Sequence, residues 1–197
     1  MQPNEVGEAI FVLVIDETYG INEERYETES EIYRLKLEAE FGAGFQQANV
    51  GPGFDIPAFL TVLDTVEIPL WSVIAGSFFL GKPINENLQA WKQIYDRLIR
   101  FFDKPVVLSR NGAAVIAVQS VFEEMGGLPK ALRLRSYKVG FVNESDQLET
   151  LKSTEEISPS PPTLNLGQVG HLFEIEADGT VFRVSVRGKE TEIIQIN

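Results

Sequence analysis

The spacing of hydrophobic and polar positions is clearest between residues 84 and 103, where it predicts an amphipathic helix. Apolar side chains recur there at steps of three and four, which places them on one face of an α-helix. These are Ile84, Leu88, Trp91, Tyr95, Leu98 and Phe102. The opposite face is polar, and Asn85 is a candidate N-cap. We therefore expect a helix over about 84–102 that packs through Trp91.

Proline and glycine positions predict three further helices, around 55–65, 70–80 and 112–125. Asp55 is a candidate N-cap for the first, since Pro57 follows within the first turn. The third has an alternative, because Asn111-Gly112 between apolar runs is also a strong hairpin signal that would pair 105–110 with 113–118. We favour a short strand followed by a helix, because the apolar pattern continues to residue 125 and Gly126-Gly127 is a typical helix stop.

Two N-terminal segments have strand patterns. Residues 9–15, AIFVLVI, form a short apolar run rich in β-branched side chains, typical of a buried strand. In residues 31–41 apolar and charged positions alternate, although the composition suits a helix equally well. We interpret 31–41 as a strand paired antiparallel with 9–15, and a helix remains the alternative.

The C-terminal part of the chain predicts a small antiparallel sheet. Residues 132–139 form a strand pattern, so that 105–139 would make a β-α-β unit. Beyond residue 168, three strand patterns are separated by Asp178-Gly179 and Gly188-Lys189, which suit tight turns. This predicts a three-stranded meander, and about thirty residues are too few to bury a core alone.

Together these elements predict an α+β protein, with a mixed α/β arrangement as the alternative. The four helices would pack on a small sheet, and the C-terminal meander would dock on them or on a partner. We expect a main domain over 1–142, a proline- and serine-rich linker or long loop over 143–167, and the meander over 168–197.

Composition and charge narrow the classes of function. The formal net charge is −12, which opposes binding to nucleic acid. The most apolar window, residues 68–81, is shorter than the roughly 20 residues of a membrane-spanning helix. The sequence has no cysteine, which suits a reducing compartment and predicts a cytoplasmic protein.

The charge is unevenly distributed along the chain. Residues 1–64 carry a net −10, residues 65–142 a net +4 and residues 143–197 a net −6. The basic middle could pair with the acidic N-terminal third, or it could contact an acidic partner. The residues that we predict for such a contact surface are Arg97, Arg100, Lys104 and Arg110.

Candidate chemistry is sparse. His171 is the only histidine, which excludes a multi-histidine metal site, and its position at the start of a strand suggests a structural role. The glycine-rich stretch 42–54 lacks the spacing of a phosphate-binding loop. Asp16 and Glu17 follow the first predicted strand, where catalytic acids often lie. We predict no metal site and no cofactor.

These patterns support two hypotheses about function. The preferred one is a non-enzymatic protein-binding or regulatory module that associates with a protein partner or with copies of itself. The alternative is a carboxylate- or metal-dependent enzyme with a cleft near residues 42–54. Two acids converging in one pocket would favour the second hypothesis.

Overall fold

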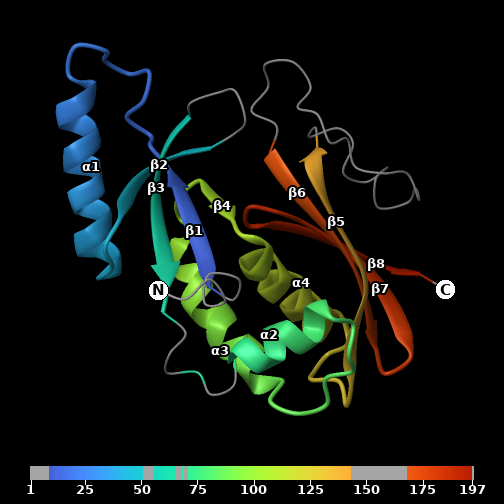
Figure 1. Ribbon diagram of the computed structural model, residues 1–197. Coiled ribbons are helices and arrows are strands. Elements are labelled where there is room, and N and C mark those ends of the chain that lie inside the picture. The colour runs from blue at the N-terminus through green and yellow to red at the C-terminus, as the bar shows by residue number, and fades with distance from the viewer. Residues whose placement is uncertain (1–8, 51–55, 65–67, 69–70, 143–167, 197) are drawn as a thin grey trace.

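The computed structural model describes residues 9–50, 56–64, 68, 71–142 and 168–196. Within these ranges the chain forms two four-stranded antiparallel sheets and four α-helices. The predicted α+β class is therefore confirmed. Figure 1 shows the first sheet beside α1 (Tyr26–Phe41) and the second sheet on the opposite side, with α4 (Arg110–Glu124) between the two sheets.

The first sheet has the order β2-β3-β1-β4. Its strands are β1 (Ile10–Ile15), β2 (Gln46–Val50), β3 (Ile56–Leu63) and β4 (Val106–Leu108). Side chains alternate in burial along β1, because successive residues point to opposite faces. Ile10, Val12 and Val14 lie on the fully buried face, and Asp16 continues the same face just beyond the strand.

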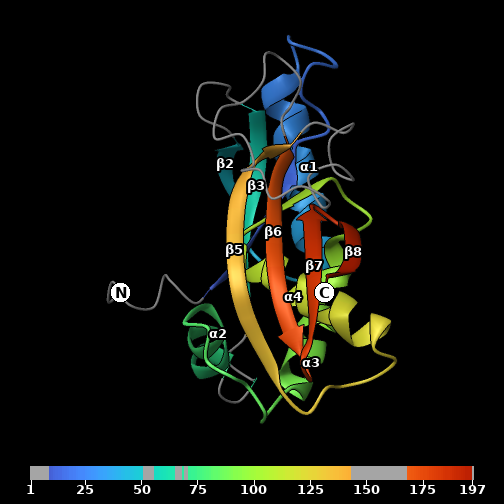
Figure 2. The same cartoon turned by 90° about the vertical axis from the view of Figure 1, so that its right-hand side faces the viewer.

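The second sheet is a meander of β5 (Leu132–Val142), β6 (Gln168–Ala177), β7 (Thr180–Arg187) and β8 (Glu190–Ile196). Its last three strands are the predicted meander, and β5 joins them as a fourth strand. The β6–β7 turn uses Asp178 and Gly179, both with positive φ, as the sequence predicted. Figure 2 shows the strands side by side in this order, with β8 at one edge.

Helix α4 is the centre of the core, because it contacts strands of both sheets and α3 (Gln89–Leu98). Ten of its residues are buried, from Asn111 to Phe122. The hydroxyl of Ser109 caps the helix by accepting a hydrogen bond from Gly112 N. A Cβ added at Gly112 would lie 3.2 Å from Ile10, so glycine permits this close approach of α4 to β1.

The predicted helix around Trp91 is confirmed in its centre. Trp91 is fully buried and makes edge-to-face contacts with Trp71 and Phe78 of α2 (Trp71–Phe79). The helix predicted at 70–80 is confirmed as α2, in which Trp71 and Phe78 are buried. The helix itself is shorter than predicted, since α3 begins at Gln89 and a 3₁₀ turn, η1 (Ile99–Phe101), follows it.

The prediction for residues 84–88 was wrong. Asn87 has a positive φ of 58°, which breaks the helix, and Asn85 is not the N-cap. Ile84 instead pairs with Leu132 through two backbone hydrogen bonds, at 2.7 and 2.8 Å. A tertiary contact with β5 thus replaces the first helical turn.

The helix predicted around 55–65 is also wrong, because residues 56–63 form β3 in the middle of the first sheet. Pro57 is tolerated because β1 ends at Ile15, so no ladder hydrogen bond is required from the missing N–H. Its carbonyl still accepts a 2.9 Å hydrogen bond from Asp16 N. Pairing with β1 and β2 overrides the local capping signal.

Residues 31–41 are helical rather than extended, as part of α1. Residues 10–15 pair instead with β3 and β4. The alternating pattern led to a wrong strand prediction because α1 buries few side chains against the sheet. Ser30 and Leu37 are buried, whereas Ile32 and Leu35 are exposed. Because apolar side chains lie on both the buried and the exposed side of this helix, they recur at every second residue, which is the spacing expected of a strand.

One further expectation about the sheets was wrong. Residues 105–139 do not form a β-α-β unit, because β4 belongs to the first sheet and β5 to the second. The first sheet is the predicted small sheet, and the second contains the predicted C-terminal meander. The helix chosen over the hairpin at 112–125 is confirmed as α4.

Candidate functional site

The side chain of Asp16 joins β1 to α1 and is 2 % exposed. Its Oδ1 accepts hydrogen bonds from the backbone N–H and the hydroxyl of Thr18, at 2.9 and 2.7 Å. Its Oδ2 accepts from the hydroxyls of Ser30 and Tyr26, at 2.6 and 3.2 Å. Both carboxylate oxygens are therefore saturated by donors from the β1–α1 loop and from α1 itself.

Tyrosine hydroxyls support this junction as neutral donors. Burial, together with the nearby Asp16 carboxylate, raises the pKa of Tyr26. Burial also raises the pKa of Tyr33, and its hydrogen bond to Glu17 acts in the same direction. The Tyr33 hydroxyl donates to Glu17 Oε2 at 2.7 Å. Asp16 and Glu17, the predicted catalytic candidates, thus both accept hydrogen bonds from α1.

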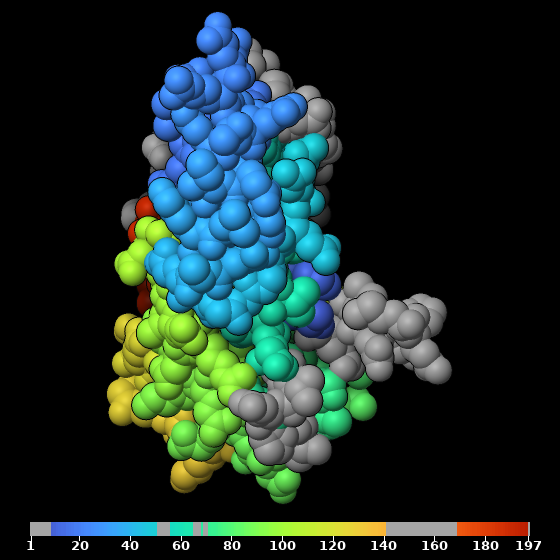
Figure 3. Space-filling view, turned by 90° about the vertical axis from the view of Figure 1, so that its left-hand side faces the viewer, coloured from blue at the N-terminus to red at the C-terminus, as the bar shows by residue number. Residues whose placement is uncertain are grey.

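A cleft of about 570 Å³ opens beside Asp16, between α1 and the strands β2 and β3. Figure 3 shows α1 lying across this side of the molecule with β2 beside it. The polar side chains among the described lining residues are Asp16, Tyr26, Glu27, Ser30, Glu31, Gln47 and Asn49. Three of these are carboxylates, and no described residue that lines the cleft is basic.

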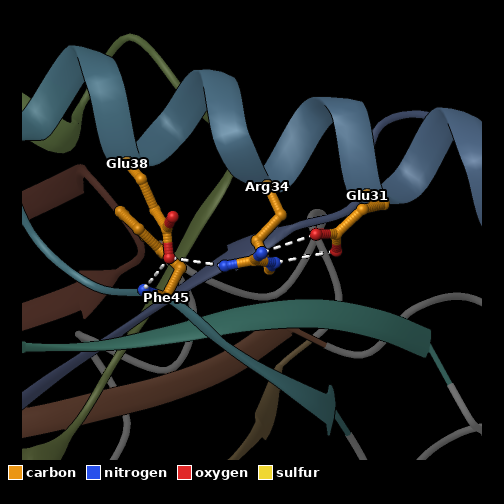
Figure 4. A network of polar contacts seen from close by, with 4 residues as sticks. All are labelled: Glu31, Arg34, Glu38 and Phe45. Atoms are coloured by element: carbon orange, nitrogen blue, oxygen red, sulfur yellow. Dashed lines mark hydrogen bonds and ion pairs between the residues drawn. The ribbon is translucent and has the colours of Figure 1, made fainter.

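A network next to the cleft fixes β2 against α1, as Figure 4 shows. The Arg34 guanidinium donates to both carboxylate oxygens of Glu31, at 2.9 and 2.6 Å, and to Glu38 Oε1 at 2.5 Å. The same Glu38 oxygen accepts from Phe45 N at 3.1 Å, immediately before β2. The Arg34 guanidinium also lowers the pKa of Glu31. This side of the cleft is therefore built by α1 carboxylates that already hold one guanidinium.

The position of the cleft agrees in part with the sequence. It lies near the glycine-rich stretch 42–54, of which residues 46–50 are β2 and residues 51–54 lie outside the described part. The sequence singled out Asp16 but no residue of the acidic run at 23–31. Glu27 and Glu31 of that run line the cleft, and only the helical phase of α1 brings them there.

Three of the four predicted basic contact residues make separate contacts within the chain. Arg97 donates to the backbone oxygen of Asp64 at 2.8 Å, and Lys104 forms a 3.0 Å ion pair with Glu40 of α1. The Arg110 guanidinium lies 4.1 Å from the centre of the Phe79 ring, a cation–π geometry. Arg100 is exposed. Their contact with a partner stays a prediction.

His171 lies on the inner face of the second sheet and is 4 % exposed. Its Nδ1 lies 3.0 Å from the Tyr137 hydroxyl, and its ring stacks with the rings of Tyr137 and Phe173. Burial lowers the pKa of His171 to about 4, although a hydrogen bond with the Leu108 backbone opposes the shift. This environment is the structural one that the sequence suggested.

Two general features hold over the described ranges. They contain no group of three or more histidine, cysteine or acidic side chains placed to hold a metal ion. Within the same ranges no helix is long and apolar enough to cross a membrane. Comparison with known proteins found no protein family, no curated protein and no solved structure that matches this chain.

Proposed function

We propose that this protein is a non-enzymatic binding module that takes a cationic side chain of a partner protein, from lysine or arginine, into the cleft between α1 and β2. The observation that carries this proposal is the lining of the cleft. Three carboxylates line about 570 Å³ of space, and the described lining residues include no lysine, arginine or histidine. Arg34 binds Glu31 from beside the cleft and Asp16 is held by hydroxyl and backbone donors, so Glu27 is the lining carboxylate left for a ligand. Such a site attracts cations and rejects anions.

The surrounding charge supports the same partner. Residues 1–64 carry a net −10, so a basic segment approaching α1 is attracted over the Debye length of about 8 Å at physiological salt. Arg34 shows that α1 can hold a guanidinium in a fixed geometry, since Glu31 binds it through two parallel hydrogen bonds. A partner's arginine or lysine would meet Glu27 and the amide side chain of Gln47 in the same way.

Binding is favoured over catalysis because of how Asp16 is held. A general acid, a general base or a nucleophile needs a carboxylate oxygen within hydrogen-bond reach of the substrate. Both oxygens of Asp16 already accept two hydrogen bonds each from the protein. The carboxylate therefore orders the junction of β1 and α1. Glu27 and Glu31 are both exposed acids of the cleft, and Glu31 already binds Arg34. We also infer a cytoplasmic location, from the absence of cysteine.

The test is an NMR titration with three blocked tripeptides, Gly-Lys-Gly, Gly-Arg-Gly and Gly-norleucine-Gly. The two cationic peptides should shift the amide signals of Tyr26, Gln47 and their neighbours, and the norleucine peptide should not. Glu27→Gln should weaken binding several-fold, because one exposed ion pair contributes up to about 1 kcal/mol.

The matched control is Glu24→Gln, which removes the same charge from an exposed position that is not among the described lining residues. It should leave the titration unchanged. Equal weakening by both variants would show general attraction to an acidic surface and would overturn the proposal. Stabilisation of the protein by Mg²⁺ or Mn²⁺ that Glu27→Gln removes would instead favour the carboxylate-dependent enzyme.

A further inference from the structure

We infer that β8 is an interface between two copies of this chain, which pair antiparallel along their β8 strands and join two four-stranded sheets into one. β8 is an edge strand of the second sheet, paired on one side with β7. Figure 2 shows it at the edge of the sheet, beyond β7. The pairing of two copies does not depend on the cleft.

The turn geometry shows which backbone groups of β8 face outward. Gly188 and Lys189 form a two-residue loop between the paired residues Arg187 and Glu190, and such a pair exchanges backbone hydrogen bonds. The backbone N–H and C=O groups of successive residues in a strand point to opposite sides. Those of every second residue from Glu190 therefore point to β7, namely Glu190, Glu192, Ile194 and Ile196. Those of Thr191, Ile193 and Gln195 face the open edge.

The same alternation agrees with the other strands of the sheet. The β6–β7 turn closes at the pair Ala177 and Thr180, which directs every second residue of β7 to β6 and the remaining ones to β8. At the opposite edge of the sheet, the same alternation points the backbone groups of Leu132 in β5 away from β6. They exchange two hydrogen bonds there with Ile84. The hydrogen-bond pattern of all four strands therefore agrees that the backbone groups of Ile193 point to the open edge.

β8 is complementary to a second copy of itself. When two β8 strands are placed antiparallel with Ile193 opposite Ile193 of the second copy, Thr191 lies opposite Gln195 and Gln195 opposite Thr191. All three positions direct backbone groups across the junction, which gives roughly six hydrogen bonds. Thr191 and Gln195 are exposed and Ile193 is half-buried, so these backbone groups are accessible.

Charged side chains do not lie directly opposite one another in this register. Glu192 lies opposite Ile194 of the second copy and Glu190 opposite its Ile196, so no acid faces an acid directly. Next to Ile194 in the ladder is Arg183 of β7, on the same face of the sheet. Arg183 already binds Glu174 of β6, and the two Glu192 side chains are diagonal neighbours across the junction, so charge neither drives nor directly opposes this pairing.

Two other sheet edges have a covering contact at one end, whereas no backbone hydrogen bond within the described residues covers the open side of β8. The beginning of β5 is covered by Ile84, and Glu38 accepts the N–H of Phe45 at the start of the edge strand β2. Within the described residues β8 has an unbroken register with β7 and contains no lysine, no proline and no bulge. Lysine, proline and bulges are devices that keep an edge strand from pairing, and the charged side chains that β8 does carry, Glu190 and Glu192, lie opposite isoleucines in this register.

The test is size-exclusion chromatography with light scattering at 1–100 µM protein. The wild type should show a mass approaching twice 22.0 kDa as concentration rises. Gln195→Pro should give a monomer at every concentration, because it removes an outward N–H without removing a hydrogen bond to β7. Gln195→Ala is the matched control, since it keeps the N–H and should still dimerise.

Circular dichroism and thermal melting would show whether Gln195→Pro is folded. If Gln195→Pro does not fold, Thr191→Pro takes its place, since it also removes an outward N–H. A wild type that stays monomeric at 100 µM would overturn the inference. So would a folded proline variant that dimerises as strongly as Gln195→Ala.

Discussion

Ser30 of α1 donates a 2.6 Å hydrogen bond to Oδ2 of Asp16, the residue that directly follows β1. Both side chains are at least 95 % buried, at 4 and 2 % exposure. A hydrogen bond to a buried carboxylate is stronger than one between neutral groups. This pair therefore fixes α1 on the first sheet and sets the position of the cleft wall that carries Glu27.

Asp16→Ala should lower the free energy of unfolding by about 2–4 kcal/mol, because it leaves the buried Ser30 hydroxyl and its neighbouring donors without their acceptor. Urea denaturation measures the loss. Asp16→Asn keeps one acceptor oxygen and an amide that can donate to Ser30, so it should lose less. An Asp16→Ala protein as stable as the wild type would contradict the role given to this carboxylate.

Trp91→Ala should cost about 3–5 kcal/mol, the usual range for removing a large aromatic side chain from a core. Trp91 is fully buried between Trp71 and Phe78. Its Nε1 has no hydrogen-bond partner among the described residues, so Trp91→Phe should cost clearly less. Unchanged thermal melting of Trp91→Ala would mean that α3 does not pack through this residue.

Gly188→Ala should destabilise the protein more than Gly126→Ala, although both glycines have positive φ, 55° and 70°. A Cβ at Gly188 would lie 2.8 Å from the backbone oxygen of Val106, whereas one at Gly126 meets open space. Gly126→Ala therefore measures the backbone strain alone, about 1 kcal/mol. Equal losses in thermal or urea unfolding would show that the turn between β7 and β8 does not pack on β4.

His171 should make stability depend on pH between about 6.5 and 4. Its pKa falls from 6.5 to about 4 on folding, so in this range the unfolded chain binds more protons than the folded protein. Stability therefore rises with pH here, and lowering the pH from 6.5 to 4 should remove about 3 kcal/mol. Urea unfolding at a series of pH values measures this slope.

The control for this pH dependence is His171→Phe, which keeps an aromatic ring beside Tyr137 and Phe173 and removes the titration. Its stability should be nearly flat between pH 6.5 and 5. The carboxylates of Glu174 and Asp178 have lowered pKa values, so their contribution is lost at lower pH, below about 4.5. An unchanged slope in His171→Phe would show that another group titrates.

The local pattern of residues was sufficient to predict those elements whose buried face is set by their own apolar spacing or whose turn is set by adjacent residues. Helix α3 has one apolar face around Trp91, α4 is apolar almost throughout and ends at glycines, and Asp178-Gly179 makes a tight turn whatever surrounds it. Periodicity and turn chemistry depend on neighbouring residues only, so the sequence by itself determined these elements and the α+β class. It also indicated Asp16 as a candidate at the end of the first strand.

The tertiary structure decided the rest, because the determining partners are distant in sequence. Residues 56–63 become a strand because β1 and β2 flank them, and Ile84 leaves its helix because Leu132 pairs with it. The acidic cleft exists only because α1 is a helix, which brings Glu27 and Glu31 to the side of Asp16 and Gln47. A single sequence shows the charge of such residues, whereas their convergence depends on long-range pairing that no local pattern encodes.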